Sequence, residues 1–543
     1  MRIVIFILFL ATCLLYASVD NKKIFVVANM LDKQSVELAK TYCKYRAIPE
    51  KNIILLDIPK NTGIVSRDFY VQYIENALFS KLIELDAINA LDLKSNDSYG
   101  RSQLILSRIN LDYLVLCKGV PWGVSDREKS KRMAISPANS DASVDSEISA
   151  RFLPANKYKG FMKNPAFAKT GDEWRSYGLI RVARLDGASF DDVKKMLQNT
   201  QDVESRGIVG RAYFDKCKRA KLGDDWIDSA AKILKEQGFD VSVDESRTVM
   251  NLGHRMDYPA LYFGWYSSHP CGYFSIPKFS MKGIIGWHIY SFSAFNLSNK
   301  NAWTPTLISN GATATDGNVF EPYLALTRNI GVFTKLMFED NLLPAEAAFA
   351  ALPVLSWQNI YIGDPLFNPL KVDLDTQLAN LSNDELSQYV VIRKANLIMS
   401  KLGKDKAREF LKKYEGKIPD VAIKWKLFEL SDIQSEKLDY ILDSINYEKL
   451  DYLGLSFQAC KQLEQMGKAD KALEYYEKIF YKYLTIDSIA RYSAICAESA
   501  AKRCNKEVSG LIKTMLSTIA DEKRKAQEAK LKKQNSHNVN KKL

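Results

Sequence analysis

The residue types that carry out nucleophilic chemistry gather around one apolar segment, GIIGWHIYSFSAF, at 283–295. Ser291 and Ser293 lie where this segment ends, and a serine becomes a nucleophile when a neighbouring base accepts its proton. His288 precedes Ser291 by three residues within an expected strand, so the two side chains point to opposite faces and do not pair directly. His269 can reach either serine from the neighbouring strand end. A serine hydrolase that uses His269 or His288 is therefore one interpretation of the chain.

Carboxylates provide a second candidate for chemistry. Asp316, Glu321 and Asp364 fall at or just beyond expected strand ends. Together with His288 they would hold a hard or borderline cation, or act as an acid/base pair. Asp364 and Glu321 also precede prolines, where turn and cap residues are ordinary. No motif requires a cofactor, and the metal is left open. Further charged residues that could fold over the same edge are Asp145, Glu147, Arg184 and Asp186.

Aromatic side chains accompany the same segments and suggest binding without catalysis. Tryptophan and tyrosine rings stack on sugars and peptide groups, while nearby acids orient polar groups. The sequence has no glycine-rich phosphate loop, HExxH or GxSxG motif. This counts against the common nucleotide-binding, zinc-protease and α/β-hydrolase classes. The candidate binding aromatics are Trp122, Trp265, Tyr266, Trp287 and Tyr323.

Short apolar runs that end in Gly, Ser, Asp or Pro would position these residues. KIFVVANM, NIILLDIP and LDYLVLC alternate with amphipathic stretches, which is the βαβ pattern of a parallel sheet. Ligands collect beyond the carboxyl ends of the strands in such sheets. We therefore expect an α/β domain over 22–372, with a polar insertion at 125–173, that brings the GWY, SFS, ATD and GDP tips to one edge.

An ordered set of short blocks carries a family resemblance. VPWGV, VDSE, RLDG, YFGWY, HIYSFSA, GATAT-G with EPY, and GDPL occur in this order and resemble an uncharacterised family of exported bacterial proteins. More distantly, the chain resembles the gingipain-like cysteine peptidases, which have a caspase-type α/β fold. This resemblance implies that Trp265 stands at the position of the catalytic His, and Ser291 or Ser293 in place of the Cys. Because an indole accepts no proton, it implies a peptidase fold without the His/Cys dyad.

Beyond residue 372 the sequence changes to helix formers. KLGKDKAREFLKKY and QMGKADKALEYYEKIF resemble each other and tetratricopeptide repeats. We expect an all-α, repeat-like domain over 373–520 and a basic, disordered tail over 521–543. The net charge of +12 is not accompanied by a nucleic-acid-binding motif with interleaved aromatics, so nucleic acid is not an expected partner.

The first residues, MRIVIFILFLATCLLYAS, have the pattern of a signal peptide over 1–18. The apolar run is short for a membrane span, although an uncleaved anchor is the alternative. We therefore expect an exported protein (periplasmic, cell-surface or secreted) with no transmembrane domain in its mature chain. The leading hypothesis is a pseudoenzyme that binds a peptide, a glycan or an envelope protein at the strand-end rim. The alternative is the hydrolase or the carboxylate site described above.

Overall fold

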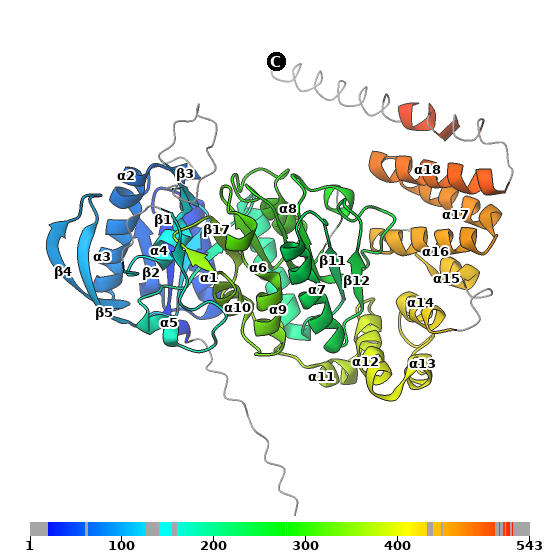
Figure 1. Cartoon of the computed structure of the whole chain (residues 1–543), viewed down its shortest axis with the longest axis horizontal. Coiled ribbons are helices and arrows are strands. Elements are labelled where there is room, and N and C mark those ends of the chain that lie inside the picture. Colours follow the sequence, from blue (N-terminus) through cyan, green and yellow to red (C-terminus); the bar gives the residue numbers. More distant parts are fainter. Residues whose placement is uncertain are drawn as a thin grey trace, which may run out of the picture.

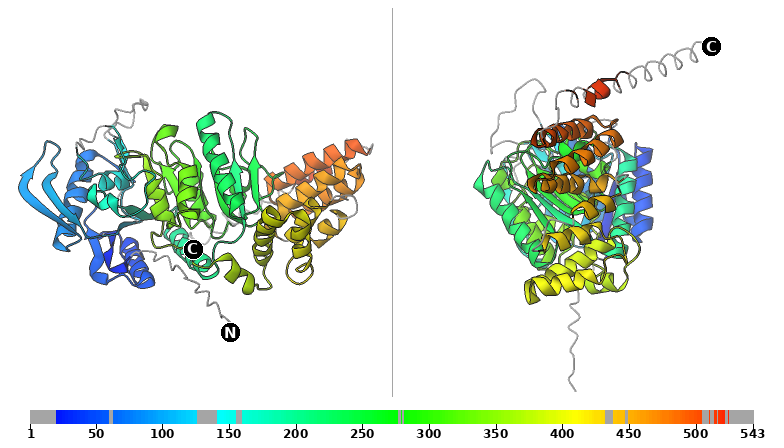
Figure 2. Two further views of the ribbon diagram at one scale, coloured as in Figure 1. Left: turned by 60° about the horizontal axis from the view of Figure 1, so that its bottom comes forward. Right: turned by 90° about the vertical axis from the view of Figure 1, so that its right-hand side faces the viewer.

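The computed structural model describes residues 20–59, 63–125, 141–154, 160–276, 279, 281–431, 438–446 and 449–504, with a few further positions between 510 and 524. The molecule is elongated, and a stack of helices adjoins one end of an α/β domain (Figures 1 and 2). The expected signal peptide lies outside the described residues. So do 126–140 and 155–159 of the expected insertion and 525–543 of the expected tail.

A ten-stranded, mostly parallel sheet runs through the α/β domain and confirms the expected α/β class. Its central strands are buried at every position except Val182 of β10, whereas the two edge strands are partly exposed, as expected for a sheet covered on both faces. In spatial order the strands are β12 (Val241–Asp244), β11 (Arg211–Asp215), β13 (Pro259–Trp265), β14 (Ile285–Ile289), β15 (Ala314–Asn318), β17 (Asn359–Gly363), β10 (Val182–Leu185), β6 (Tyr113–Cys117), β1 (Ile24–Asn29) and β2 (Ile53–Leu56).

Strand direction separates one expected tip from the others. The strands from β12 to β15 pair in parallel, but β17 runs antiparallel to β15, with Gly363 beside Ala314. Ala314 is the first residue of β15, so the GDP segment after β17 lies at the edge where β15 begins. The expectation that all four tips share one edge is therefore wrong for GDP. Hydrophobic periodicity indicates a strand but does not indicate its direction.

Helices cover both faces of the sheet, and alternate strand residues face different helices. In β1, Val26 belongs to the same buried cluster as Leu38 of α1, whereas Val27 clusters with Leu78 of α3. One face carries α1 (Lys33–Arg46), α6 (Phe190–Arg206) and α8 (Trp303–Ser309). The other carries α3 (Asn76–Glu84), α4 (Val144–Ser149), α7 (Lys221–Glu236), α9 (Ile330–Phe338) and α10 (Pro344–Ala350).

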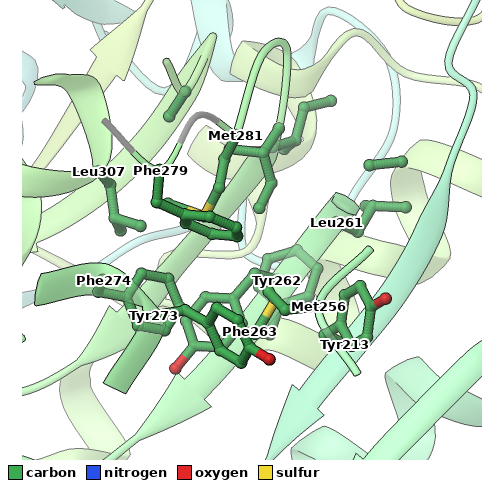
Figure 3. Packing of buried hydrophobic residues seen from close by; sticks show 14 of the residues in the cluster. Tyr213, Met256, Leu261, Tyr262, Phe263, Tyr273, Phe274, Phe279, Met281 and Leu307 are labelled. Carbon is green, nitrogen blue, oxygen red and sulfur yellow. The ribbon is translucent and has the colours of Figure 1, made fainter. Parts of the chain in front are cut away.

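The core beneath the GWY and SFS tips is aromatic. Phe263 and Trp287 contact Phe333 of α9. On the opposite face, Tyr262 contacts Phe274, and Figure 3 shows this pair within the surrounding cluster. Trp287, a candidate binding residue, is therefore a core residue.

Shorter elements complete the α/β domain. An antiparallel ribbon of β4 (Ile88–Asn96) and β5 (Ser102–Ile109), which the sequence analysis did not foresee, projects from its end (Figure 1). All six residues of α4 are buried, so this part of the expected polar insertion is core. The remaining short elements of the α/β domain are β3 (Ile64–Val65), β7 (Gly123–Val124), β8 (Ala142–Ser143), β9 (Met162–Lys163), β16 (Val354–Leu355), α2 (Arg67–Phe69), α5 (Glu173–Ser176) and a π-helical turn at Tyr70–Glu75.

The remainder of the described chain is helical. Two pairs of consecutive helices turn at Gly403 and Gly467, whose φ values of 88° and 78° favour glycine. The helices are α11 (Leu374–Ala379), α12 (Ser387–Leu402), α13 (Lys404–Lys412), α14 (Val421–Glu429), α15 (Leu438–Ser444), α16 (Leu453–Gln465), α17 (Ala469–Lys482) and α18 (Asp487–Arg503). Within the described residues, no helix has both the length and the apolarity needed to cross a bilayer.

Polar and aromatic contacts fix the helical unit to the sheet domain. The Tyr389 hydroxyl donates to Asp257 at 2.7 Å, and Lys426 forms an ion pair with Asp240 at 3.1 Å. The ring of Tyr258 lies 5.4 Å from that of Tyr389. Because these groups are buried or nearly so, the helical unit forms a continuous structure with the sheet domain.

Candidate functional site

The ends of β6, β13 and β14 meet at the carboxyl edge of the sheet. Trp122, which follows β6, donates from Nε1 to the carbonyl of Phe295 at 3.1 Å. Tyr266, which follows β13, has its ring 5.2 Å from that of Tyr290. We call the surface formed by Trp122, Tyr266, Tyr290, Ser291, Phe292, Phe295, Glu321 and Tyr323 the carboxyl rim. The structure thus brings Trp122, Tyr266, Ser291, Glu321 and Tyr323 of the candidate set into one region.

Two aromatic residues of the carboxyl rim have a left-handed backbone. The φ values are 61° at Phe292 and 59° at Tyr323, and each such non-glycine residue costs on the order of 1–3 kcal/mol. The N–H of Phe292 donates to the carbonyl of Phe320 at 3.0 Å, and that of Tyr323 donates to Glu321 Oε1 at 3.1 Å. Backbone strain of this kind gathers at binding and catalytic sites.

Ser291 has a carboxylate partner instead of a histidine. Its hydroxyl donates to Glu321 Oε2 at 2.6 Å. A carboxylate is a far weaker base than a serine alkoxide, so this hydrogen bond orients the hydroxyl without deprotonating it. The pair presents one hydroxyl and one negative charge beside exposed rings, which suits polar recognition.

Ser293 has a structural position. It is 3% exposed, and its Oγ accepts the N–H of Asn318 at 2.9 Å. This hydrogen bond joins the segment after β14 to the last residue of β15. Ser293 is therefore not available as a nucleophile.

His288 is the centre of a buried hydrogen-bond chain. Its Nε2 accepts the N–H groups of Ser267 at 3.0 Å and Tyr266 at 3.3 Å. The neutral ring therefore carries its proton on Nδ1 and donates to the hydroxyl of Tyr262 at 2.9 Å, which donates to Asp215 Oδ2 at 3.0 Å. Trp303 stacks on His288 with 3.9 Å between centroids. Both ring nitrogens are occupied, so His288 holds the loop after β13 and does not serve Ser291.

Burial sets the protonation of both ends of this chain. It lowers the pKa of His288 to about 3 and raises that of Asp215 to about 7. His288 is therefore neutral near pH 7, as its hydrogen bonds require. Asp215 titrates in the range in which an acid/base group works, but its described contacts are internal.

The other two candidate positions for a base do not supply one. His269 is exposed, and its Nδ1 contacts the hydroxyl of Ser268 at 2.8 Å. Trp265 is 4% exposed and donates from Nε1 to Asp224 Oδ1 at 2.8 Å. No contact joins either residue to Ser291 within the described part of the chain. The geometry therefore does not support a Ser–His hydrolase at the carboxyl rim.

The three candidate carboxylates do not converge. Asp316 is buried in β15, forms an ion pair with Arg328 at 2.9 Å and accepts from Asn359 at 3.3 Å. Burial raises its pKa to about 6, although Arg328 opposes the shift. Asp364 lies at the opposite edge. Among the described residues, no group of three or more His, Cys, Asp or Glu side chains is arranged to hold a metal. The expectation of a joint site at Asp316, Glu321 and Asp364 is therefore wrong.

Asp364 instead takes part in an ion cluster at the amino-terminal edge. It accepts from the Tyr42 hydroxyl at 2.7 Å and from Arg46 Nε at 2.6 Å. Arg46 also binds Glu204 through both Nη atoms at 2.9 Å. This cluster fastens α1 and α6 to the end of β17.

The remaining charged candidates form buried pairs. Arg184 binds Asp145 at 2.6 Å and donates to the carbonyls of Val120 and Pro121 at 2.8 and 2.9 Å. It therefore positions the segment that leads to Trp122. Asp186 pairs with Lys118 at 3.2 Å. Burial raises the pKa of Glu147, and Arg67, 3.1 Å away, opposes that shift. These pairs are internal to the fold, and no contact within the described part of the chain joins them to the carboxyl rim.

Sequence reasoning identified Tyr266 but missed Phe295 and Arg219, which lie beside it or on the same rim. Tyr266 is 38% exposed and Phe295 is 43% exposed, so the carboxyl rim presents apolar rings to solvent. Arg219 lies over the Tyr266 ring at 4.5 Å. The YFGWYS motif identified Tyr266, whereas Arg219 and Phe295 lie in loops that carry no periodic signal.

Comparison of the chain with family models, curated proteins and solved structures finds no match.

Proposed function

We propose that this chain is an exported, peptidase-like α/β protein that lacks a His/Cys dyad and binds a peptide, glycan or envelope partner at the carboxyl rim. The observation that carries the proposal is the pairing of exposed rings, Tyr266 and Phe295, with the Ser291–Glu321 couple, which no histidine contacts among the described residues. Exposed aromatic rings beside oriented polar groups are the usual composition of a recognition surface.

The arrangement of the strands supports the peptidase-like part of the proposal. The resemblance requires the strand of the His block to adjoin the strand of the nucleophile block. In the sheet β13 pairs with β14, then come β15 and β17, which carry the glycine-alanine and GDP blocks. Trp265 at the end of β13 makes the dyad incomplete on this alignment. The helical hairpins at Gly403 and Gly467, with buried Ala407 and Ala472, support a tetratricopeptide-like unit.

The test is binding of the mature chain to arrays of envelope glycans and of short peptides. Replacing Tyr266 with Ala removes an exposed ring and should weaken capture about tenfold, the usual effect of losing one aromatic anchor. The matched control is Tyr481→Ala, because Tyr481 is 55% exposed but lies on α17. Equal affinity of the two variants would rule out the carboxyl rim as the recognition surface.

The 2.6 Å contact between Ser291 and Glu321 orients the serine hydroxyl, and a hydrolase with Ser291 as its nucleophile is the second candidate function. In that case, Ser291→Ala would abolish turnover of an ester or peptide substrate while ligand capture persists. Under the binding proposal, the wild-type chain and Ser291→Ala show the same absence of turnover in a chromogenic ester and peptide screen.

A further inference from the structure

A cavity of about 580 Å³ opens at the edge of the sheet opposite the carboxyl rim. It lies beside Asn21 before β1, Arg181 before β10 and Leu366 after β17, between the end of α1, α5 and α10. Its volume falls within the range of small-molecule sites, roughly 300–1,000 Å³. No candidate residue named from the sequence lies in it.

One wall of the cavity is a prebuilt ion pair. The Arg181 guanidinium lies 4.4 Å from the Trp174 ring and 4.3 Å from the Tyr113 ring. Its Nη1 donates to Glu346 Oε1 at 2.9 Å, and Glu346 Oε2 accepts the N–H of Leu343 at 3.2 Å. Arg181 is 6% exposed. Because its charge is already neutralised and its plane is fixed, this wall is rigid and electrically balanced.

Among the other charged residues that line the cavity, negative charges outnumber positive ones, although the net charge of the whole chain is +12. Apart from the Arg181–Glu346 pair, the charged lining residues are Arg46 and Lys169, which are positive, and Asp172, Glu173 and Asp340, which are negative. Near the mouth, the exposed residues Asp172 and Glu173 outnumber Lys169. The lining as a whole therefore has an excess of one negative charge, which favours a positively charged ligand.

The cavity also offers apolar surface, to which Leu342, Leu343, Phe349 and Leu366 contribute. A ligand that joins a cationic group to an apolar body therefore matches this lining.

We propose that this cavity binds a small organic cation, a primary amine or guanidinium attached to an apolar or aromatic body. The cationic group lies near Asp172 and Glu173, and the apolar body lies against Leu343 and Phe349. The source is a free amine or the basic side chain of a peptide. This site is separate from the carboxyl rim and does not depend on the function proposed for it.

The experiment is calorimetric titration of the mature chain at pH 7 and low salt with three matched probes. Phenethylamine should bind, 2-phenylethanol should bind at least tenfold more weakly, and phenylacetate should not bind. A blocked tripeptide, acetyl-Gly-Arg-Gly-amide, distinguishes the sources. If the peptide binds as well as the amine, the ligand of the cavity is the basic side chain of a peptide. If only the amine binds, the ligand is a free amine. Either result supports the proposal.

Two surface variants test whether the charges at the cavity determine its affinity for a cation, without disturbing the core. Glu173→Gln should weaken phenethylamine binding about two- to fivefold, and Lys169→Gln should strengthen it by a similar factor, the usual range for exposed charge pairs. Tyr481→Ala on α17, far along the chain from the cavity lining, should leave the affinity unchanged. Phenylacetate binding as tightly as phenethylamine, or equal affinities of the two charge variants, would overturn the proposal. Melting curves equal to that of the unmodified chain exclude a folding defect in either variant.

Discussion

The hydroxyl of Ser291 donates to Glu321 Oε2 at 2.6 Å, and this hydrogen bond joins the segment after β14 to the segment after β15. Ser293, two residues later, accepts the buried N–H of Asn318. The two serines of the SFS tip therefore have different roles. Ser291 is 8% exposed and bonds to the half-buried Glu321 of the carboxyl rim, whereas Ser293 holds the neighbouring strand.

Their substitution by alanine should separate these roles. Ser293→Ala leaves a buried N–H without its acceptor and should lower the free energy of unfolding by about 1–3 kcal/mol. Ser291→Ala removes a donor from the half-buried Glu321, which water can still solvate, and should cost at most about 1 kcal/mol. Urea denaturation of both variants measures the difference. A larger loss of stability in Ser291→Ala than in Ser293→Ala would mean that the Ser291 hydroxyl is the more important of the two for folding.

The antiparallel direction of β17 places Asp364 at the edge of the sheet opposite the carboxyl rim. Substitution of Asp364 tests this placement. Asp364→Ala removes the buried partner of Tyr42 and Arg46 and should cost about 3 kcal/mol, as expected when one member of a buried pair is lost. Affinity at the carboxyl rim should remain unchanged, because the residue lies at the opposite edge. Denaturation and array binding of the same preparation measure the two effects. A stable variant with weakened rim binding would contradict this placement.

The contact between the helical unit and the sheet domain depends on a glycine inside α16. A Cβ on Gly454 would lie 2.0 Å from the carbonyl oxygen of His254 and 2.3 Å from the Tyr273 hydroxyl. Gly454→Ala should therefore loosen the interface, although alanine favours a helix by about 1 kcal/mol. We expect faster amide exchange along α16 in this variant. Gly510→Ala, where the added Cβ meets nothing within 4 Å, is the control. Equal exchange of α16 in the two variants would show that the interface tolerates the added atom.

Sequence reasoning predicted the α/β class and several strand tips, because buried parallel strands read as apolar runs that end abruptly. It also placed His288 and Ser291 on opposite faces, and their partners, Tyr262 and Glu321, differ accordingly. It did not predict the antiparallel direction of β17, and it assigned Trp287 to a binding surface. Both errors have one cause. Period-two alternation distinguishes two faces but says neither whether a face is covered by helices nor which way the strand runs.

The two ends of the His288–Tyr262–Asp215 chain should have opposite effects on the pH dependence of stability. The pKa of His288 is about 3 in the folded chain and about 6.5 when unfolded. The contribution of the neutral His288 to the free energy of unfolding is therefore complete above about pH 6.5 and is lost as the pH falls. The pKa of Asp215 is about 7 in the folded chain and about 3.9 when unfolded. The contribution of the protonated Asp215 to the free energy of unfolding is complete below about pH 4 and is lost as the pH rises. Between about pH 4 and 6.5 the two slopes oppose each other.

When either His288 or Asp215 is replaced, the free energy of unfolding should show the pH dependence of the residue that remains. In Asp215→Asn, the free energy of unfolding should fall as the pH is lowered from about 6.5, with a slope approaching 1.4 kcal/mol per pH unit relative to the unmodified chain. In His288→Gln it should instead fall as the pH is raised from about 4 to 7, with a slope of the same size. Urea denaturation at half-unit pH steps measures both variants against the unmodified chain. Slopes of the same sign in the two variants would show that the buried ring and carboxylate do not titrate as this hydrogen-bond chain requires.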